Sequence, residues 1–210
     1  MMKKNYVAMA IGLPVTLILM LSVMLQAGWI GSFDRFFQHS TQLVPNLQDL
    51  MLKITALASP KMNLVWMALI AVILWIKNQR PLALNIVLLL ISVDAVGLVI
   101  KHVVKRARPV QHLTIDDGYS FPSGHVLGMA TIVLWLILIL VPIIIQSQTT
   151  RTWVDILLVV GLLVVMVSRV YVYAHYPSDV CGSVAVATMW FGIFEWAWRK
   201  LTPRTKKNDF

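Results

Sequence analysis

Six long apolar runs divide this chain, and they constrain its fold more than any other feature. A helix needs about 20 apolar residues to cross the hydrocarbon core of a bilayer, and backbone groups in lipid must be paired within the protein. The predicted spans cover about residues 7–29, 59–77, 82–100, 126–145, 153–173 and 180–198. The sequence therefore predicts an all-α, integral-membrane bundle of six transmembrane helices, which we expect to form a single domain over residues 1–210.

The composition excludes several classes of protein. Hydrophobic residues make up 59% of the chain and charged residues 13%, which leaves no room for a large soluble domain beside six spans. The net charge of +9 comes from Lys and Arg residues that mostly lie between the apolar runs. This pattern indicates membrane topology and anion binding, so we expect no nucleic-acid partner. Cys181 is the single cysteine, which excludes an intramolecular disulfide.

The first run follows two basic residues, Lys3 and Lys4, as the core of a signal peptide does. A signal core has about 7–15 residues, and this run is longer than that. We therefore expect an uncleaved first helix, with cleavage after Ala27 as the alternative.

A second, shorter pattern lies between the first two spans. After Pro45 and Asn46, apolar residues recur at helical spacing. They are Leu47, Leu50, Met51, Ile54 and Leu57. This spacing predicts a short amphipathic helix that lies on the membrane surface.

The loops also predict an orientation. With the amino terminus inside, ten basic residues fall on the cytoplasmic side and eight on the outer side. Five of the outer eight belong to the polar motifs described next: Lys101, Lys105, Arg106, Arg108 and Arg169. If those five residues are on the outer side because they serve the site, the remaining basic residues number ten inside and three outside. That excess on the cytoplasmic side follows the positive-inside rule. We therefore expect both termini in the cytoplasm and the motifs on the extracytoplasmic side of the cell membrane.

The first motif follows the third span. Lys101 and Arg108 stand seven residues apart, about two helical turns, so a continuing helix would present both cations on one face. The alternative is a basic helix end that anchors to lipid headgroups.

The second motif precedes the fourth span. Pro122 and Ser123 suit a helix start, Gly124 lets a ligand approach the backbone, and His125 follows. Free N–H groups at a helix start bind anions such as a phosphate. The alternative is an ordinary serine cap beside an interfacial histidine.

The third motif lies between the fifth and sixth spans. His175 and Asp179 are four residues apart around Pro177, so their side chains can come within hydrogen-bonding range. A carboxylate that holds one imidazole nitrogen leaves the other free to attack. A purely structural pair, with Arg169 as an interfacial anchor, is the alternative. An even number of crossings separates the motifs, so all three emerge on one side of the membrane.

A His–Asp pair can also bind a metal, but the neighbouring charges argue against it. Lys101, Arg108 and Arg169 would repel a divalent cation and attract an anion. We therefore predict a phosphate site without a metal ion and without any other cofactor.

Together these residues resemble the three-part signature of the type 2 phosphatidic acid phosphatase superfamily. Every signature position is matched, and three ordered motifs with correct internal spacing are far more specific than one. The matching residues are Lys101, Arg108, Pro109, Pro122, Ser123, Gly124, His125, Ser168, Arg169, His175 and Asp179. The six-span layout is also similar to that of compact bacterial members of this family.

The resemblance implies a metal-independent lipid phosphatase that works through a phosphohistidine. His175 would be the nucleophile, Asp179 its orienting carboxylate and His125 the general acid and base. The phosphoryl oxygens would be bound by Lys101, Arg108, Ser123, Gly124 and Arg169. The expected partners are the bilayer and a lipid phosphate: undecaprenyl diphosphate, phosphatidylglycerophosphate or phosphatidic acid.

Two other functions fit parts of the sequence. A lipid-to-lipid phosphotransferase would use the same histidines with an alcohol in place of water. An anion or lipid transporter would use the cations alone, and it is the less favoured reading. Asp94, inside the third span, needs a partner, and pairing with another helix is favoured over a part in catalysis.

Overall fold

The computed structural model describes residues 2–111, 113 and 118–202, and every regular element in that part of the chain is helical. The long helices are α1 (Met2–Met24), α5 (Arg80–Val104), α8 (Gln148–Tyr171) and α9 (Pro177–Leu201), and the shorter ones are α2 (Gly28–Gln42), α3 (Gln48–Leu57) and α4 (Pro60–Ile76). One further rod begins as α6 (Gly124–Trp135), passes through the π-helical segment η1 (Leu136–Leu140) and ends as α7 (Val141–Ile144). The predicted all-α fold class is confirmed.

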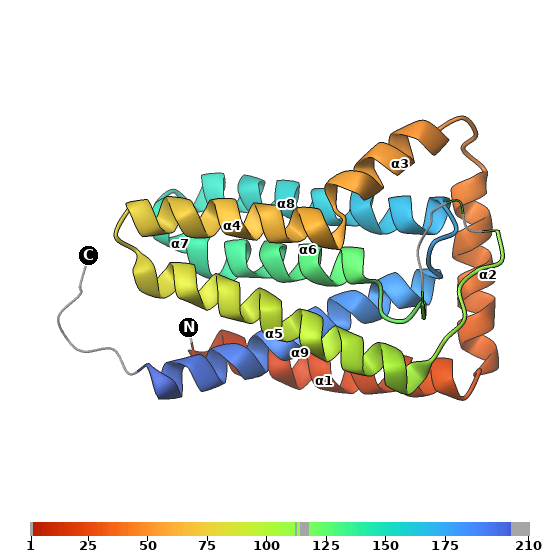
Figure 1. Cartoon of the computed structure of the whole chain (residues 1–210), viewed down its shortest axis with the longest axis horizontal. Coiled ribbons are helices and arrows are strands. Elements are labelled where there is room, and N and C mark those ends of the chain that lie inside the picture. The colour runs from red at the N-terminus through yellow and green to blue at the C-terminus, as the bar shows by residue number, and fades with distance from the viewer. Residues whose placement is uncertain (1, 112, 114–117, 203–210) are drawn as a thin grey trace.

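Five helical segments are long and apolar enough to cross a membrane, and the bent pair α3–α4 makes a sixth candidate. The bend between α3 and α4 is 48°. It occurs at Ser59, whose side chain caps the new helix by accepting a hydrogen bond from the Met62 amide, with Pro60 in the first turn. The predicted amphipathic helix corresponds to α3, which leans away from the bundle in Figure 1.

The predicted end of the first span was wrong. We expected residues 7–29 to be helical throughout, but α1 ends at Met24 and the backbone turns at Gln26, where φ is 50°. The chain then starts a separate helix, α2, which the sequence analysis did not anticipate. In α2 the apolar residues are interrupted by polar ones, so no run of transmembrane length marks it. Figure 1 shows α2 lying across one end of the bundle.

Helix α9 packs along α1, α6 and α5, and it also contacts α2 and α8, so it is the central helix of the bundle. Gly12 allows the closest approach between α1 and α9, because a Cβ atom there would overlap the backbone of Met189. Three polar side chains inside the bundle are paired with one another: Trp135 Nε1 donates to Asn85 Oδ1 (2.6 Å), and Asn85 Nδ2 donates to Glu195 Oε1 (2.7 Å). Such pairing removes most of the cost of placing polar side chains between membrane helices.

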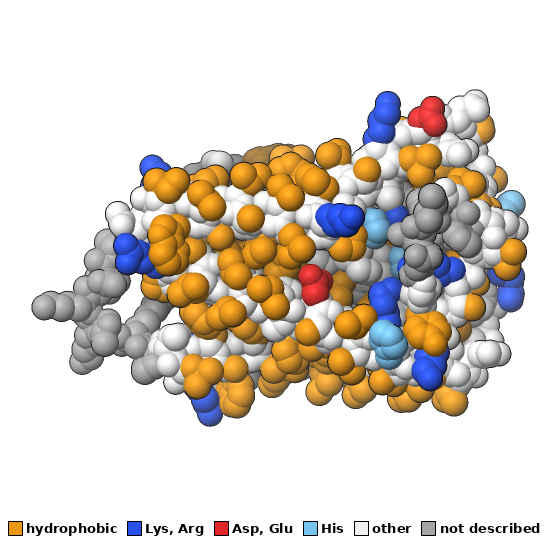
Figure 2. Space-filling view, viewed as in Figure 1, with side chains coloured by type: hydrophobic (Ala, Val, Ile, Leu, Met, Phe, Trp, Pro, Cys, Tyr) orange, Lys and Arg blue, Asp and Glu red, His pale blue; other side chains and the backbone are white. Residues whose placement is uncertain are grey.

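The two ends of the bundle differ in character. The start of α1 and the end of α9 lie toward the end opposite α2 (Figure 1), where Arg80 stacks over Trp75 and Lys200 over Trp196. Hydrophobic side chains cover most of the face between the ends (Figure 2). This arrangement is that of a multi-pass membrane protein. Of the basic residues used to predict the orientation, Arg204, Lys206, Lys207 and the side chains of Lys3 and Lys4 lie outside the described part of the chain.

Candidate active site

The turn between α8 and α9 holds His175. Two residues after α8 ends at Tyr171, Tyr173 adopts a left-handed conformation with φ of 56°. The chain then folds back, so that the amides of Ala174 and His175 donate to the carbonyl of Arg169 at 3.1 and 3.3 Å. This turn fixes the backbone of His175, whose side chain is only 1% exposed.

The His175 imidazole lies between a carboxylate and a cation. Its Nδ1 is 3.7 Å from Asp179 Oδ2, and its Nε2 is 3.2 Å from Nη1 of Arg108. Asp179 Oδ2 also accepts a hydrogen bond from the Tyr176 amide at 3.0 Å, which holds the carboxylate at the start of α9. The first and third motifs therefore meet at one ring, although 67 positions separate Arg108 from His175.

The surroundings of His175 favour its neutral form. Burial, the largest effect, disfavours the charged imidazolium, and Arg169 and Arg108 act in the same direction. Asp179 opposes them, but the net result lowers the pKa of His175 to about 4. The imidazole is therefore unprotonated near neutral pH, as a nucleophile must be.

The second motif docks onto α9 before α6 begins. The Ser123 amide donates to Ser183 Oγ at 2.8 Å, and Phe121 packs so closely that a Cβ atom on Gly182 would overlap its ring. The Ser123 hydroxyl does not cap α6. It is buried and has no hydrogen-bond partner within the described residues, so it remains free to bind a ligand oxygen.

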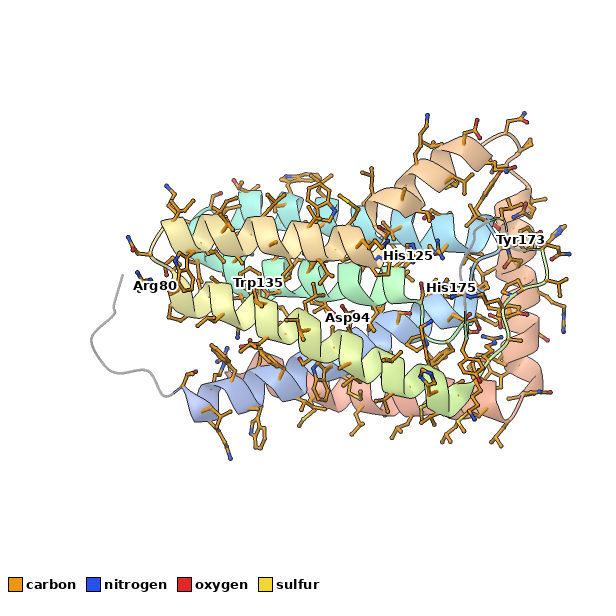
Figure 3. The ribbon with its side chains drawn as sticks, in the orientation of Figure 1. Arg80, Asp94, His125, Trp135, Tyr173 and His175 are labelled. Carbon is orange, nitrogen blue, oxygen red and sulfur yellow. The ribbon has the colours of Figure 1, made fainter. Side chains whose placement is uncertain are left out.

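His125 lies in the first turn of α6, and its side chain is buried. The carbonyl of His125 accepts a hydrogen bond from Asn63 Nδ2 on α4 at 3.2 Å, which ties the start of α6 to its neighbour. In Figure 3, His125 and His175 both lie in the half of the bundle nearer α2, while Arg80 and Trp135 lie toward the other end.

The remaining predicted cations lie on the surrounding helices. Lys101 is in the last turn of α5, where its Nζ donates to the Tyr119 carbonyl at 2.7 Å, just before the second motif. Arg169 is completely buried in the last turn of α8. Its neighbour Ser168 shares a hydrogen bond of 3.1 Å with Thr55 on α3. All three motifs are thus at the same end of the bundle.

The structure adds two residues that the sequence analysis did not assign to the site, Arg106 and Asp34. Arg106 Nη1 lies 2.6 Å from Asp179 Oδ1, and its Nη2 lies 2.6 Å from Asp34 Oδ2 on α2. Asp34 also accepts from the Ser178 amide and hydroxyl at 2.8 and 2.9 Å. Arg106 was visible in the first motif as a basic residue, but no sequence signal connected Asp34 with it, because α2 itself was not predicted.

The chemistry of these groups is that of an anion site. Within the described residues, no three His, Cys, Asp or Glu side chains are grouped closely enough to hold a metal ion. A buried imidazole, a serine hydroxyl and cationic side chains are groups that can bind and transfer a phosphoryl group.

The comparison with known families agrees with this geometry. The model of the PAP2 superfamily matches residues 82–203, which is more than half of the chain and includes all three motifs. The chain therefore belongs to the PAP2 superfamily, as the resemblance in its sequence indicated.

Individual relatives have been identified as well. Over 123 residues the chain is 30% identical to an undecaprenyl-diphosphatase of Sulfolobus acidocaldarius, a match that covers 55% of each chain. Over 115 residues it is 36% identical to phosphatidylglycerophosphatase B of Haemophilus influenzae, covering 53% of this chain and 42% of that one. The chain thus spans about half the length of the curated relatives it matches.

A solved structure shares the whole fold. The crystal structure of a transmembrane PAP2-type phosphatidylglycerolphosphate phosphatase from Bacillus subtilis superimposes with a TM-score of 0.80. The match covers 93% of this chain and 99% of that one at 22% sequence identity. The likeness establishes a common transmembrane architecture.

Proposed function

We propose that this protein is a membrane lipid phosphatase that removes phosphate or diphosphate headgroups through a phosphohistidine on His175. The observation that carries the proposal is the position of the His175 ring between Asp179 and Arg108. The carboxylate faces Nδ1, so the lone pair used for attack is on Nε2, beside a cation that attracts phosphate. The names of the curated relatives, undecaprenyl-diphosphatase and phosphatidylglycerophosphatase B, support the same reaction class.

In the first step, Nε2 of His175 attacks phosphorus and forms a P–N bond. The bond from phosphorus to the lipid-side oxygen breaks, and that oxygen takes a proton from His125. The imidazolium that develops on His175 is stabilised by Asp179. The lipid product leaves, and the phosphoryl group remains on His175.

In the second step, His125 acts as a base. It takes a proton from water, and the water oxygen attacks phosphorus while the P–N bond breaks. Inorganic phosphate leaves, His175 is neutral again, and His125 is protonated for the next cycle. No metal ion or cofactor is required by this proton balance.

The cations and the helix start would stabilise the charge on the phosphoryl group. Arg108, Lys101 and Arg169 would bind its oxygens together with the Ser123 hydroxyl and the Gly124 amide. Phosphoryl transfer depends almost entirely on such positioning and electrostatic stabilisation. The free Ser123 hydroxyl supports this assignment, because a serine that only capped α6 would have its oxygen occupied.

We further propose that the site faces the extracytoplasmic leaflet. Lys77, Arg80, Arg151, Arg199 and Lys200 lie in the loops and helix ends away from α2, as cytoplasmic residues would under the positive-inside rule. The motifs are at the other end, near headgroup depth, where a lipid can present its phosphate while its tail stays in hydrocarbon.

The proposal is tested by phosphate release from the purified protein in detergent. The panel consists of a prenyl diphosphate, phosphatidic acid and phosphatidylglycerophosphate, with and without an added lipid alcohol. We expect inorganic phosphate from at least one lipid. Transfer of phosphate to the alcohol without free phosphate would show a phosphotransferase instead, and no turnover of any lipid would refute the proposal.

A further inference from the structure

Asp94 is an acidic side chain in the apolar part of α5. It lies seven residues before Lys101, which is about 10 Å along the helix, and on a similar face. Figure 3 labels it roughly midway along the bundle, and in Figure 2 an acidic side chain at that place is surrounded by hydrophobic ones. The sequence analysis favoured pairing of Asp94 with a neighbouring helix.

Among the described residues, Asp94 has no such partner. No residue in the described part of the chain forms a hydrogen bond or ion pair with Asp94. Glu195, another acidic residue within the bundle, differs from Asp94 because it accepts a hydrogen bond from Asn85. A carboxyl group without a partner in hydrocarbon is costly, so such a residue is expected to serve function.

Asp94 opens onto a cleft that leads to the candidate active site. The cleft has a volume of about 110 Å³ and runs between α5 and the start of α6, with Asp94 among its lining residues and Lys101 and Gly124 among the others. Both Lys101 and Gly124 belong to the predicted phosphate-binding set. Between Asp94 and Lys101 the lining residue Gly97 has no side chain, and a Cβ atom there would overlap Leu127.

A second, larger cavity offers no comparable group. It has a volume of about 330 Å³ and is lined only by glycine and apolar residues of α3, α4, α6 and α8, such as Trp66 and Val165. It contains none of the predicted site residues, so it can hold hydrocarbon but cannot distinguish one headgroup linkage from another. Of these two cavities, only the cleft with Asp94 places polar groups beside the predicted phosphate-binding residues.

We propose that Asp94 is a specificity-determining residue that hydrogen-bonds an oxygen of the substrate's glycerol backbone. The preferred substrates are then glycerol-based lipid phosphates rather than prenyl diphosphates. This inference rests on the proposed phosphatase function. A carboxyl group accepts a hydrogen bond from a hydroxyl and, when protonated, donates one to an ester carbonyl. A glycerolipid carries such oxygens a few bonds below its phosphate, whereas a prenyl chain has only hydrocarbon there and leaves Asp94 unsatisfied.

The test compares kcat/KM for phosphatidic acid and for a prenyl diphosphate in the same detergent. The variants are Asp94→Leu, which cannot hydrogen-bond, and Asp94→Asn, which can; Val99→Ala on the exposed face of α5 is the control. We expect Asp94→Leu to lose roughly tenfold on phosphatidic acid and to keep its activity on the diphosphate, while Asp94→Asn and Val99→Ala retain the wild-type ratio.

The possible failures are distinguishable. Leucine within a membrane helix favours insertion, so Asp94→Leu should fold. A wild-type preference for the prenyl diphosphate, or an unchanged ratio in Asp94→Leu, would overturn the specificity inference and leave the phosphatase intact. A wild-type protein that releases phosphate from neither lipid would instead refute the function on which the inference rests.

Discussion

Arg106 forms an ion pair with Asp179 in which Nη1 and Oδ1 are 2.6 Å apart, and this pair connects the candidate active site to α2. The second nitrogen of the same guanidinium bonds Asp34, so one cation lies between two buried carboxylates. Asp179 therefore meets Arg106 with one oxygen and faces His175 with the other. We infer that Arg106 and Asp34 are positioning residues for the His175–Asp179 pair.

Replacement of Arg106 tests this inference. Arg106→Gln leaves Asp34 and Asp179 without their cation, and removal of one partner from a buried pair costs about 3 kcal/mol of stability. A displaced Asp179 should also lower kcat by roughly tenfold or more. Thermal unfolding in detergent and phosphate release measure the two effects.

The matched control is Arg35→Gln, because Arg35 is an exposed arginine on α2 that bonds the nearby Ser32 hydroxyl and no other side chain within the described residues. It should change neither quantity. Equal behaviour of the two variants would show that the network around Arg106 has no part in positioning the site.

Removal of the nucleophile should abolish turnover. In His175→Asn no imidazole remains to form the P–N bond, so the loss of kcat should reach several orders of magnitude while lipid binding persists. His39→Asn, at an exposed position of α2, should behave as wild type. Labelled phosphate should be trapped on the wild-type protein after acid-free quenching and not on His175→Asn. If His175→Asn still released phosphate from the lipid substrate, His175 would be excluded as the nucleophile.

The pH profile of kcat/KM should show an acid limb near pH 4, because that parameter reports the free enzyme and burial lowers the pKa of His175 to about 4. Activity should fall at high pH as His125 loses the proton it must donate. The profile is then bell-shaped but broad, with a plateau that extends well below pH 6. An acid limb near 6.5, the ordinary histidine value, would contradict the buried neutral imidazole.

The same shift makes stability depend on pH. Because the pKa of His175 is lower in the folded protein than in the unfolded chain, the unfolded chain binds more protons between pH 6.5 and 4. The stabilisation is complete above about pH 6.5 and is lost as the pH falls toward 4. Unfolding temperatures of wild type and His175→Asn should converge over this interval, and parallel curves would contradict the prediction.

Two serines at helix starts should respond in opposite ways. Ser123 does not cap α6, so Ser123→Ala should lower kcat by about 100-fold, the usual cost of a lost transition-state donor, with little change in stability. Ser59 does cap α4, so Ser59→Ala should lower stability by about 1 kcal/mol and leave kcat unchanged. Loss of stability in Ser123→Ala with normal kcat would assign Ser123 to the fold alone.

Inhibitors should distinguish a cationic phosphate site from a metal site. Vanadate mimics five-coordinate phosphorus, so it should compete with substrate and lose affinity in Arg108→Ala. A chelator such as EDTA should leave phosphate release unchanged, because the proposed steps use only side chains. Strong inhibition by EDTA that is restored by a divalent cation would require a metal-dependent mechanism.

The positions of the membrane helices were largely predictable, because each helix that crosses a bilayer needs a continuous apolar run of about 20 residues. Such a run is visible in the sequence of that segment alone. The predicted spans of residues 82–100 and 153–173 correspond to α5 and α8 with modest shifts at their ends. Helix α2 escaped prediction because it lies across the bundle end, where no requirement for a continuous apolar run applies.

The three motifs could also be identified from the sequence, because the polar residues of each lie within a few positions of one another. The alternating direction of the spans then predicts that all three lie at one end of the bundle. The sequence by itself thus determined the fold class and the family, and it supplied the candidate residues for binding and attacking phosphate. Only the tertiary structure showed that Arg106 bonds both Asp179 and Asp34, which lies 72 positions away. It also showed that neither the Ser123 hydroxyl nor Asp94 has a hydrogen-bond partner among the described residues. These relationships depend on how helices distant in the chain pack against one another, and hydrophobic periodicity, which specifies each helix and its apolar face, does not specify that packing.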